Sequence, residues 1–135
     1  MNKDKQPKTQ TLTRKEVLEL LAEKMPLAEM DMRKANLIKV DFSDCNCKNS
    51  NFSYANLKDA IFRNADLRDA SLWNANLEGA DFSGANLEGA DLDYSKLRGA
   101  VLHRANIRRA SLPTDLIPRE DIMRSVNTGC KVGSK

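Results

Sequence analysis

A five-residue period runs through most of the chain without a break. From Ala35 to Thr114 each pentad carries a small residue, a mostly polar residue, a large apolar residue and two mostly polar residues, as in Ala85-Asn86-Leu87-Glu88-Gly89. A period of five matches neither the 3.6 of an amphipathic helix nor the 2 of a long strand. In extended backbone the small and large residues point to the same side. We therefore expect short inward-facing segments joined by corners, which close into coils that stack to bury their apolar sides.

A second spacing, of twenty residues, indicates how many pentads make one coil. Phe42, Phe62 and Phe82 recur at twenty, so four pentads per coil would place them on one wall. Tyr54 and Tyr94 would likewise share a face. Asn36, Asn56 and Asn76 also recur at twenty, which predicts an amide ladder if coils lie about 4.8 Å apart.

The Ala-(Asp/Asn)-Leu-x-x pentads resemble those of the pentapeptide-repeat family over roughly two-thirds of the chain. The resemblance implies a right-handed quadrilateral β-helix, an all-β solenoid with parallel stacking of about 4 to 4.5 coils. Two looser pentads, starting at Met25 and Met30, precede the sixteen regular ones. The β-helix is therefore expected over residues 26–114.

The large positions of the pentads are the predicted core, and a narrow interior requires alanine at the small positions. The predicted core residues are Leu37, Phe42, Phe52, Leu57, Phe62, Leu67, Leu72, Leu77, Phe82, Leu87, Leu92, Leu97, Leu102, Ile107 and Leu112.

The open ends of a solenoid need covering, and the flanking sequences predict how this happens. Thr13 and Glu16 have capping-box spacing, Leu12 can staple onto Val17, and Pro26 ends the segment, so a capping helix is expected over residues 11–25. Its predicted apolar stripe is Val17, Leu18, Leu21 and Met25. Residues 1–10 are predicted to be a disordered tail.

After Leu112 the period stops, and residues 115–128 carry a second apolar set that predicts a short helical segment. Pro118 and Asp121 suit its first turn. The segment either covers the last coil or forms a dimer contact, so the chain is a monomer or a homodimer joined through its C-terminal end. Residues 129–135 are expected to be mobile. The apolar set is Leu116, Ile117, Ile122, Met123 and Val126.

No residue pattern indicates catalysis, a metal site or a cofactor. His103 is the only histidine and is expected to be a solvated corner residue. Cys45 and Cys47 occupy the small and large inward positions of one pentad, and with Cys130 they make three cysteines where a closed zinc site needs four ligands. We expect free thiols that pack as small hydrophobic groups, and no enzyme activity.

One charge pattern offers a possible partner contact. Lys96, Arg98, Arg104, Arg108 and Arg109 fall in one predicted coil with no acid among them, next to an acidic stretch from Glu78 to Asp93. They are either an ordinary soluble surface or a contact for an anionic partner. The coils from Met25 to Leu112 carry twelve acidic and twelve basic residues, and no aromatic residue is predicted beside the basic group, so direct nucleic-acid binding is not expected.

These observations predict a non-catalytic scaffold that binds a protein partner. The family resemblance also implies an alternative, because some pentapeptide-repeat proteins imitate duplex DNA and bind gyrase. A DNA mimic needs a strongly negative rod, so the balanced charge disfavours that alternative. The sequence contains no secretory signal and no membrane-spanning run, from which a cytoplasmic location and no membrane partner are expected.

Overall fold

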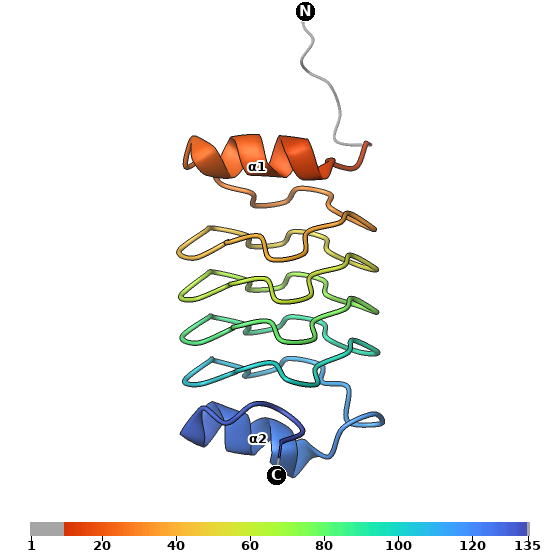
Figure 1. Ribbon diagram of the computed structural model, residues 1–135, viewed down its shortest axis with the longest axis vertical. Coiled ribbons are helices and arrows are strands. Elements are labelled where there is room, and N and C mark those ends of the chain that lie inside the picture. The colour runs from red at the N-terminus through yellow and green to blue at the C-terminus, as the bar shows by residue number, and fades with distance from the viewer. Residues whose placement is uncertain (1–9, 135) are drawn as a thin grey trace, which may run out of the picture.

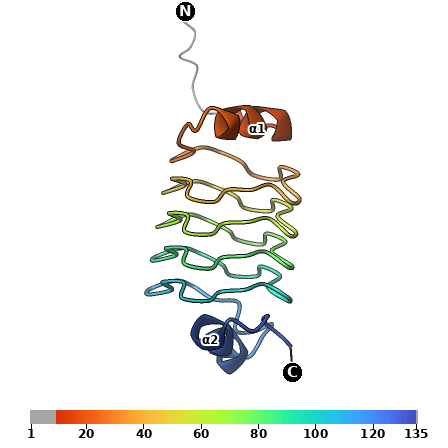
Figure 2. The ribbon, with the colours of Figure 1, turned by 60° about the vertical axis from the view of Figure 1, so that its left-hand side comes forward.

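The chain folds into a β-solenoid with one helix at each end (Figure 1). The computed structural model describes residues 10–134, so nearly all of the predicted tail, residues 1–9, and the last residue lie outside the described residues. Helix α1, Arg14–Ala22, lies across the first coil, and helix α2, Arg119–Thr128, lies against the last one (Figures 1 and 2). No helix among residues 10–134 is long and apolar enough to cross a bilayer.

Each coil takes twenty residues, as the spacing of the phenylalanines predicted. Parallel bridges join Asn36 to Asn56, Asn56 to Asn76, and Asn76 to Lys96, and the series runs from Asp31↔Asn51 to Asp91↔Ser111. Every one of these contacts is an isolated bridge, because the corners leave each wall too short for a continuous strand. The β structure therefore consists of stacked single bridges and not of extended strands.

One pentad shows why the repeat has its composition. In the pentad from Asn56 to Ala60, the first backbone N–H donates to a carbonyl of the preceding coil and the second donates to a carbonyl of the next coil. The Asp59 N–H also donates to the next coil, to the Glu78 carbonyl at 2.8 Å. The Ala60 N–H closes the turn onto the Leu57 carbonyl at 3.0 Å. The remaining donor, the Lys58 N–H, bonds Oδ1 of Asn56 at 3.2 Å. All five donors are thus paired, which buried backbone requires.

The amide ladder predicted for Asn36, Asn56 and Asn76 is wrong. Their side-chain oxygens accept from the backbone two residues further on, as in the Ile38 N–H to Asn36 bond of 3.3 Å. This is the short-range bond that Asn and Asp side chains form readily. Asn106 and Asn86 do bond each other across neighbouring coils, at 3.2 Å.

The corners are four-residue turns whose third residue is left-handed. Lys39, for example, has φ 62° and Gly79 has φ 72°. A turn that closes onto the residue three positions later with positive φ at its third position is of type II, which favours Gly or Asn there. Among residues 10–134, fourteen non-glycine residues nonetheless lie in the left-handed region, all but one of them at corners of the coils.

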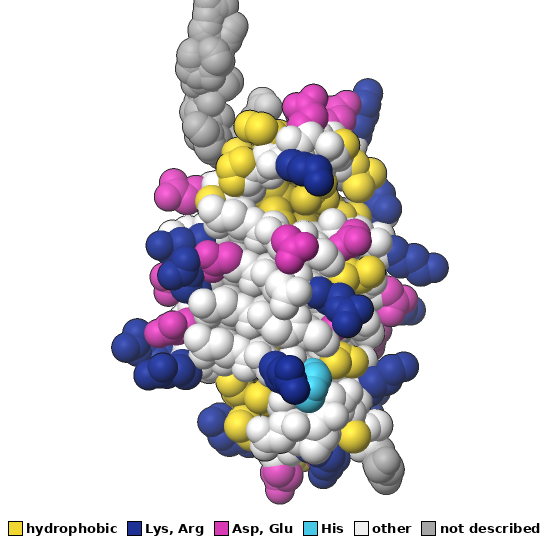
Figure 3. All heavy atoms as spheres, turned by 90° about the vertical axis from the view of Figure 1, so that its left-hand side faces the viewer, with side chains coloured by type: hydrophobic (Ala, Val, Ile, Leu, Met, Phe, Trp, Pro, Cys, Tyr) yellow, Lys and Arg dark blue, Asp and Glu magenta, His cyan; other side chains and the backbone are white. Residues whose placement is uncertain are grey.

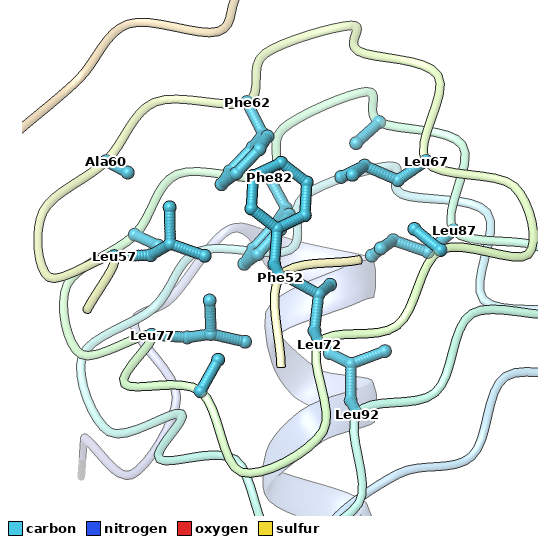
Figure 4. Packing of buried hydrophobic residues seen from close by; sticks show 14 of the residues in the cluster. Phe52, Leu57, Ala60, Phe62, Leu67, Leu72, Leu77, Phe82, Leu87 and Leu92 are labelled. Carbon is cyan, nitrogen blue, oxygen red and sulfur yellow. The ribbon is translucent and has the colours of Figure 1, made fainter. Parts of the chain in front are cut away.

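The interior is filled from four walls, as Figure 4 shows for the labelled leucine and phenylalanine side chains. Phe62 stacks between Phe42 and Phe82, with ring centroids 4.7 and 5.1 Å apart. Phe52 meets Phe42 and Phe62 edge-on from the opposite wall, at 5.6 Å in each case. The predicted core residues are buried except Ile107 and Leu112, which are only partly buried because no complete coil follows the last one.

The N-terminal segment supplies hydrogen-bond donors to the first coil. The coil's outer carbonyls have no preceding coil to bond, and the Leu12 N–H donates to the Asp31 carbonyl at 2.8 Å. The Arg14 guanidinium donates to the carbonyls of Asn36 and Ile38, at 3.0 and 3.1 Å. The N-terminal segment thus supplies donors to carbonyl groups that a preceding coil would otherwise have bonded.

Helix α1 lies inside the predicted range of residues 11–25 but begins later and ends earlier, at Arg14 and Ala22. Thr13 and Glu16 form the capping box, and Val17 is fully buried. The helix stops at Ala22, four residues before Pro26, because Lys24 turns left-handed and Met25 bonds back to Leu20 at 2.9 Å. The predicted stripe is partly wrong, since Leu18 and Met25 are exposed while Leu20 packs against the core.

The C-terminal segment supplies acceptors and one donor to the last coil. The Leu102 N–H of the last coil, which no further coil can bond, donates to Oγ of Ser125 at 2.9 Å. The Arg104 N–H donates to the Val126 carbonyl at 3.0 Å. The Val132 carbonyl accepts from the Gly99 N–H and the Val132 N–H donates to the Ala100 carbonyl, both at 2.8 Å. The Val132 side chain is buried in the core. The expectation that residues 129–135 are mobile is therefore wrong for Val132, which continues the hydrogen bonding of the solenoid.

The apolar set predicted for the C-terminal segment divides in two. Ile117 and Ile122 are buried, and Val126 packs against the core cluster. Leu116 is exposed, because it precedes α2 in the link from the last coil. The helix begins after Pro118, which occupies the N-cap, with Asp121 in the first turn.

Candidate interaction surface

The five basic residues singled out in the sequence are spread over one wall position, Lys96, and three corners of the last coil, and do not form one patch. Lys96 and Arg98 flank Leu97, Arg104 lies at the next corner, and Arg108 and Arg109 lie at the one after that. Figure 3 shows lysine and arginine side chains spread over one face among acidic ones.

Two of the five are already engaged within the chain. Arg98 donates to the Gly133 carbonyl at 3.4 Å, and Arg109 pairs with Glu88 at 3.3 Å. The arrangement fits a solvated surface with local pairing better than a single anion-binding site.

His103 differs from its prediction. Its ring packs beside Gly129, where a β-carbon would lie 3.3 Å from Cγ of the imidazole, and its Nδ1 is buried without a hydrogen-bond partner in the described part of the chain. The sequence could not show this, because the contact comes from the end of α2 and not from the repeat.

The cysteines are free thiols, as predicted. Cys47 is buried in the core, Cys45 is half-buried and Cys130 is exposed. Among residues 10–134, no three His, Cys, Asp or Glu side chains are grouped so that they could hold a metal ion.

Three aromatic side chains meet outside the solenoid, at one corner of three successive coils. The ring of Trp73 lies 5.2 Å from that of Tyr54 and 5.7 Å from that of Tyr94, edge to face in both pairs. Both tyrosines are at left-handed corner positions and are 50% and 57% exposed. We call Tyr54, Trp73 and Tyr94 the aromatic corner.

Sequence reasoning found half of this feature. The spacing of forty placed Tyr54 and Tyr94 on one face, but Trp73 is one position earlier in its pentad and therefore escaped the pattern. The corner turn brings the Trp73 ring between the two tyrosines. A search for aromatic residues at either corner position, and not only at equal spacing, would have found all three.

Apolar and acidic groups extend the aromatic corner toward the C-terminal end. Tyr94 lines a hollow of about 150 Å³ together with the exposed Leu116. Asp93 lies in the same hollow. Burial raises the pKa of Asp93, and the nearby carboxylates of Asp91 and Asp115 raise it further.

The other end of the same corner is basic. Arg33 and Lys34 occupy the corner positions one coil before Tyr54. The Arg33 guanidinium pairs with Asp31 at 2.7 Å, and this hydrogen bond holds the pKa of Asp31 below its ordinary value. The corner thus runs from positive through aromatic to negative.

Family models identify the repeat. A model described as the pentapeptide repeat region matches residues 23–92, which is just over half of the chain. The chain belongs to the pentapeptide-repeat family. A second model, of pentapeptide repeats in eight copies, matches residues 85–113. No curated protein matches the chain.

Solved structures agree with this assignment. A pentapeptide-repeat protein from the thylakoid lumen of Arabidopsis thaliana is 27% identical with a TM-score of 0.64, over 81% of this chain and 85% of the other. A pentapeptide-repeat protein from Nostoc is 30% identical with a TM-score of 0.55, over 77% and 79% of the two chains. QnrB1, a plasmid-mediated fluoroquinolone resistance protein, is 23% identical with a TM-score of 0.49, a likeness from which no shared function follows.

Proposed function

We propose that this pentapeptide-repeat chain is a non-catalytic scaffold, a right-handed quadrilateral β-helix whose aromatic corner binds a protein partner. The observation that carries the proposal is the exposure of Tyr54 and Tyr94 around Trp73 on a rigid backbone. Tyrosine and tryptophan are enriched at protein interfaces and among the residues that dominate binding energy. Holding their rings in contact before binding reduces the ordering cost of association.

The two end segments complete this scaffold as caps. The N-terminal segment bonds the free carbonyls of the first coil, and the C-terminal segment bonds the free N–H groups of the last. With both open ends covered, further coils or copies have no edge to extend. The side walls and corners are then the surfaces left for a partner.

The basic residues of the last coil are a weaker candidate contact, because they are divided among three corners. Imitation of duplex DNA is disfavoured by the twelve acidic and twelve basic residues of the coils. The aromatic corner needs no excess of either charge.

A site-specific photo-crosslinking experiment tests the proposal. Asn74 is an exposed left-handed residue next to the aromatic corner, and Asn64 holds the same position at a different corner of the coil. Their φ angles are 58° and 59°. A photoreactive amino acid at position 74, expressed in the source cells, should capture one identified protein that position 64 does not capture. The capture should fall at least tenfold in a Tyr54→Ser/Tyr94→Ser variant. Equal capture at both positions, or capture unaffected by the double substitution, would contradict the proposal.

A further inference from the structure

One pentad differs from all others in carrying a thiol at both inward positions. Cys45 stands where most pentads have alanine, and Cys47 stands in the core between Leu27 and Leu67 of the neighbouring coils. Because the repeat turns both inward positions to the same side, the two side chains converge. The Cys47 thiol donates to Cys45 Sγ across 3.4 Å.

Only one sulfur of this pair is accessible. Cys45 lines a groove of about 420 Å³ that opens between the end of α1 and the first complete coil. Lys24 and Met25 border it on the helix side, and Asp44 borders it on the coil side. Cys47 is fully buried behind Cys45. A small molecule in the groove therefore meets Cys45 first.

The contact between the thiols also distinguishes their chemistry. Donation from Cys47 lowers the pKa of Cys45, whereas the same contact and burial raise the pKa of Cys47. The thiolate is the nucleophilic form of cysteine, so the accessible sulfur is the reactive one. The protonated neighbour is the second thiol, held in place for the step that follows.

We propose that Cys45 and Cys47 form a redox-active dithiol that a hydroperoxide oxidises to an intrachain disulfide. The Cys45 thiolate attacks the terminal peroxide oxygen, forms a sulfenic acid and releases the alcohol, or water when the oxidant is hydrogen peroxide. Cys47 then attacks the Cys45 sulfur, the S–S bond forms, and the sulfenic oxygen leaves as water. Two thiols lose two electrons and two protons to one peroxide.

The disulfide should be easily reduced again. Its formation must bring the sulfurs from 3.4 Å to about 2.05 Å between residues only two apart. That change pulls Cys47 away from its place between Leu27 and Leu67. Strained disulfides have more oxidising potentials and are the labile ones, so the oxidised state is reversible and less stable.

Intact-mass analysis of the whole chain tests the proposal, with Cys130→Ser as the background to remove the exposed third thiol. One equivalent of hydrogen peroxide should remove two hydrogen atoms from the mass, and dithiothreitol should restore them. Proteolysis should place the bond within the peptide that holds both cysteines. The oxidised protein should melt at a lower temperature than the reduced one.

Two variants chosen to suit the fold serve as controls. Cys47→Val keeps an apolar side chain in the core, and its Cys45 should accumulate a sulfenic acid that dimedone traps. Cys45→Ala restores the usual pentad, and it should be neither oxidised to a disulfide nor labelled by dimedone. Direct conversion of Cys45 to sulfinic acid in the Cys130→Ser background, or an unchanged mass under peroxide with both variants folded by circular dichroism, would overturn the proposal.

Discussion

At the scale of single residues, the repeat combines an interior that tolerates little change with corners that store conformational strain. The stacked rings of Phe42, Phe62 and Phe82 fill one wall at separations set by the coils themselves. Outside, residues such as Lys39 adopt left-handed backbone without being glycine. Interior packing therefore has to offset both the strain at the corners and the ordering entropy of the coils.

Phe62→Ala should destabilise the protein by about 3–5 kcal/mol, because it removes a ring that contacts three other phenylalanines and leaves a cavity. Phe62→Leu conserves more of the volume and should cost less than about 1.5 kcal/mol. Chemical denaturation of the two variants measures the difference. Equal stability of Phe62→Ala and the parent chain would show that the stack contributes nothing.

Gly79→Ala should destabilise more than Gly99→Ala. Both glycines have positive φ, 72° and 80°, so both substitutions introduce backbone strain of about 1 kcal/mol or more. At position 79 the new methyl group would also collide with Oδ1 of Asp59, whereas at position 99 the nearest atom is 3.5 Å away. Thermal melting compares the pair. A smaller loss at position 79 would mean that Asp59 turns aside freely.

At the scale of elements, the coils follow from the sequence and the end segments do so only in part. The bridging of Asn56 to Asn76 and the Phe62 wall could be predicted, because one rule applies to every pentad. The burial of Val132 and of the His103 Nδ1 could not, because both depend on where α2 and the chain after it lie. The aromatic corner falls between these cases, since Trp73 is out of register with the tyrosines.

Ser125→Ala should destabilise the protein by about 1–3 kcal/mol, although the change removes a single oxygen atom. Its hydroxyl is the buried acceptor for the Leu102 N–H, which would be left without a partner. Thr128→Ala removes an exposed hydroxyl from the same helix and should cost less. Urea denaturation of both variants gives the comparison, and a larger loss in Thr128→Ala would contradict the assigned role of Ser125.

At the scale of the whole molecule, a parallel stack has chemically different ends. Each end leaves backbone groups that a further coil would have bonded, and each is met by an end segment that bonds some of them. Two exposed ends are complementary in the same way as neighbouring coils, so they could pair head to tail into open filaments. The end segments therefore determine whether the solenoid stays a discrete particle.

A chain ending at Leu112 should self-associate, because it exposes the N–H groups and apolar side chains that α2 and Val132 cover. Light scattering should show a monomer for the full chain and larger, concentration-dependent species for the shortened one. A shortened chain that stays monomeric beside a full-length dimer would instead assign the segment to dimer formation.

The twenty-residue register also constrains how such a chain can change in length. Removing one full coil would join each wall to its own continuation, so a shorter but intact rod should result. Removing a single pentad would rotate the following part of the chain by a quarter turn. The phenylalanines on either side of the deletion would then lie on different walls, and the aromatic residues on either side of it would lie at different corners. A change of five residues between Tyr54 and Tyr94 should therefore disrupt the aromatic corner, whereas an insertion of twenty there should keep both tyrosines at one corner.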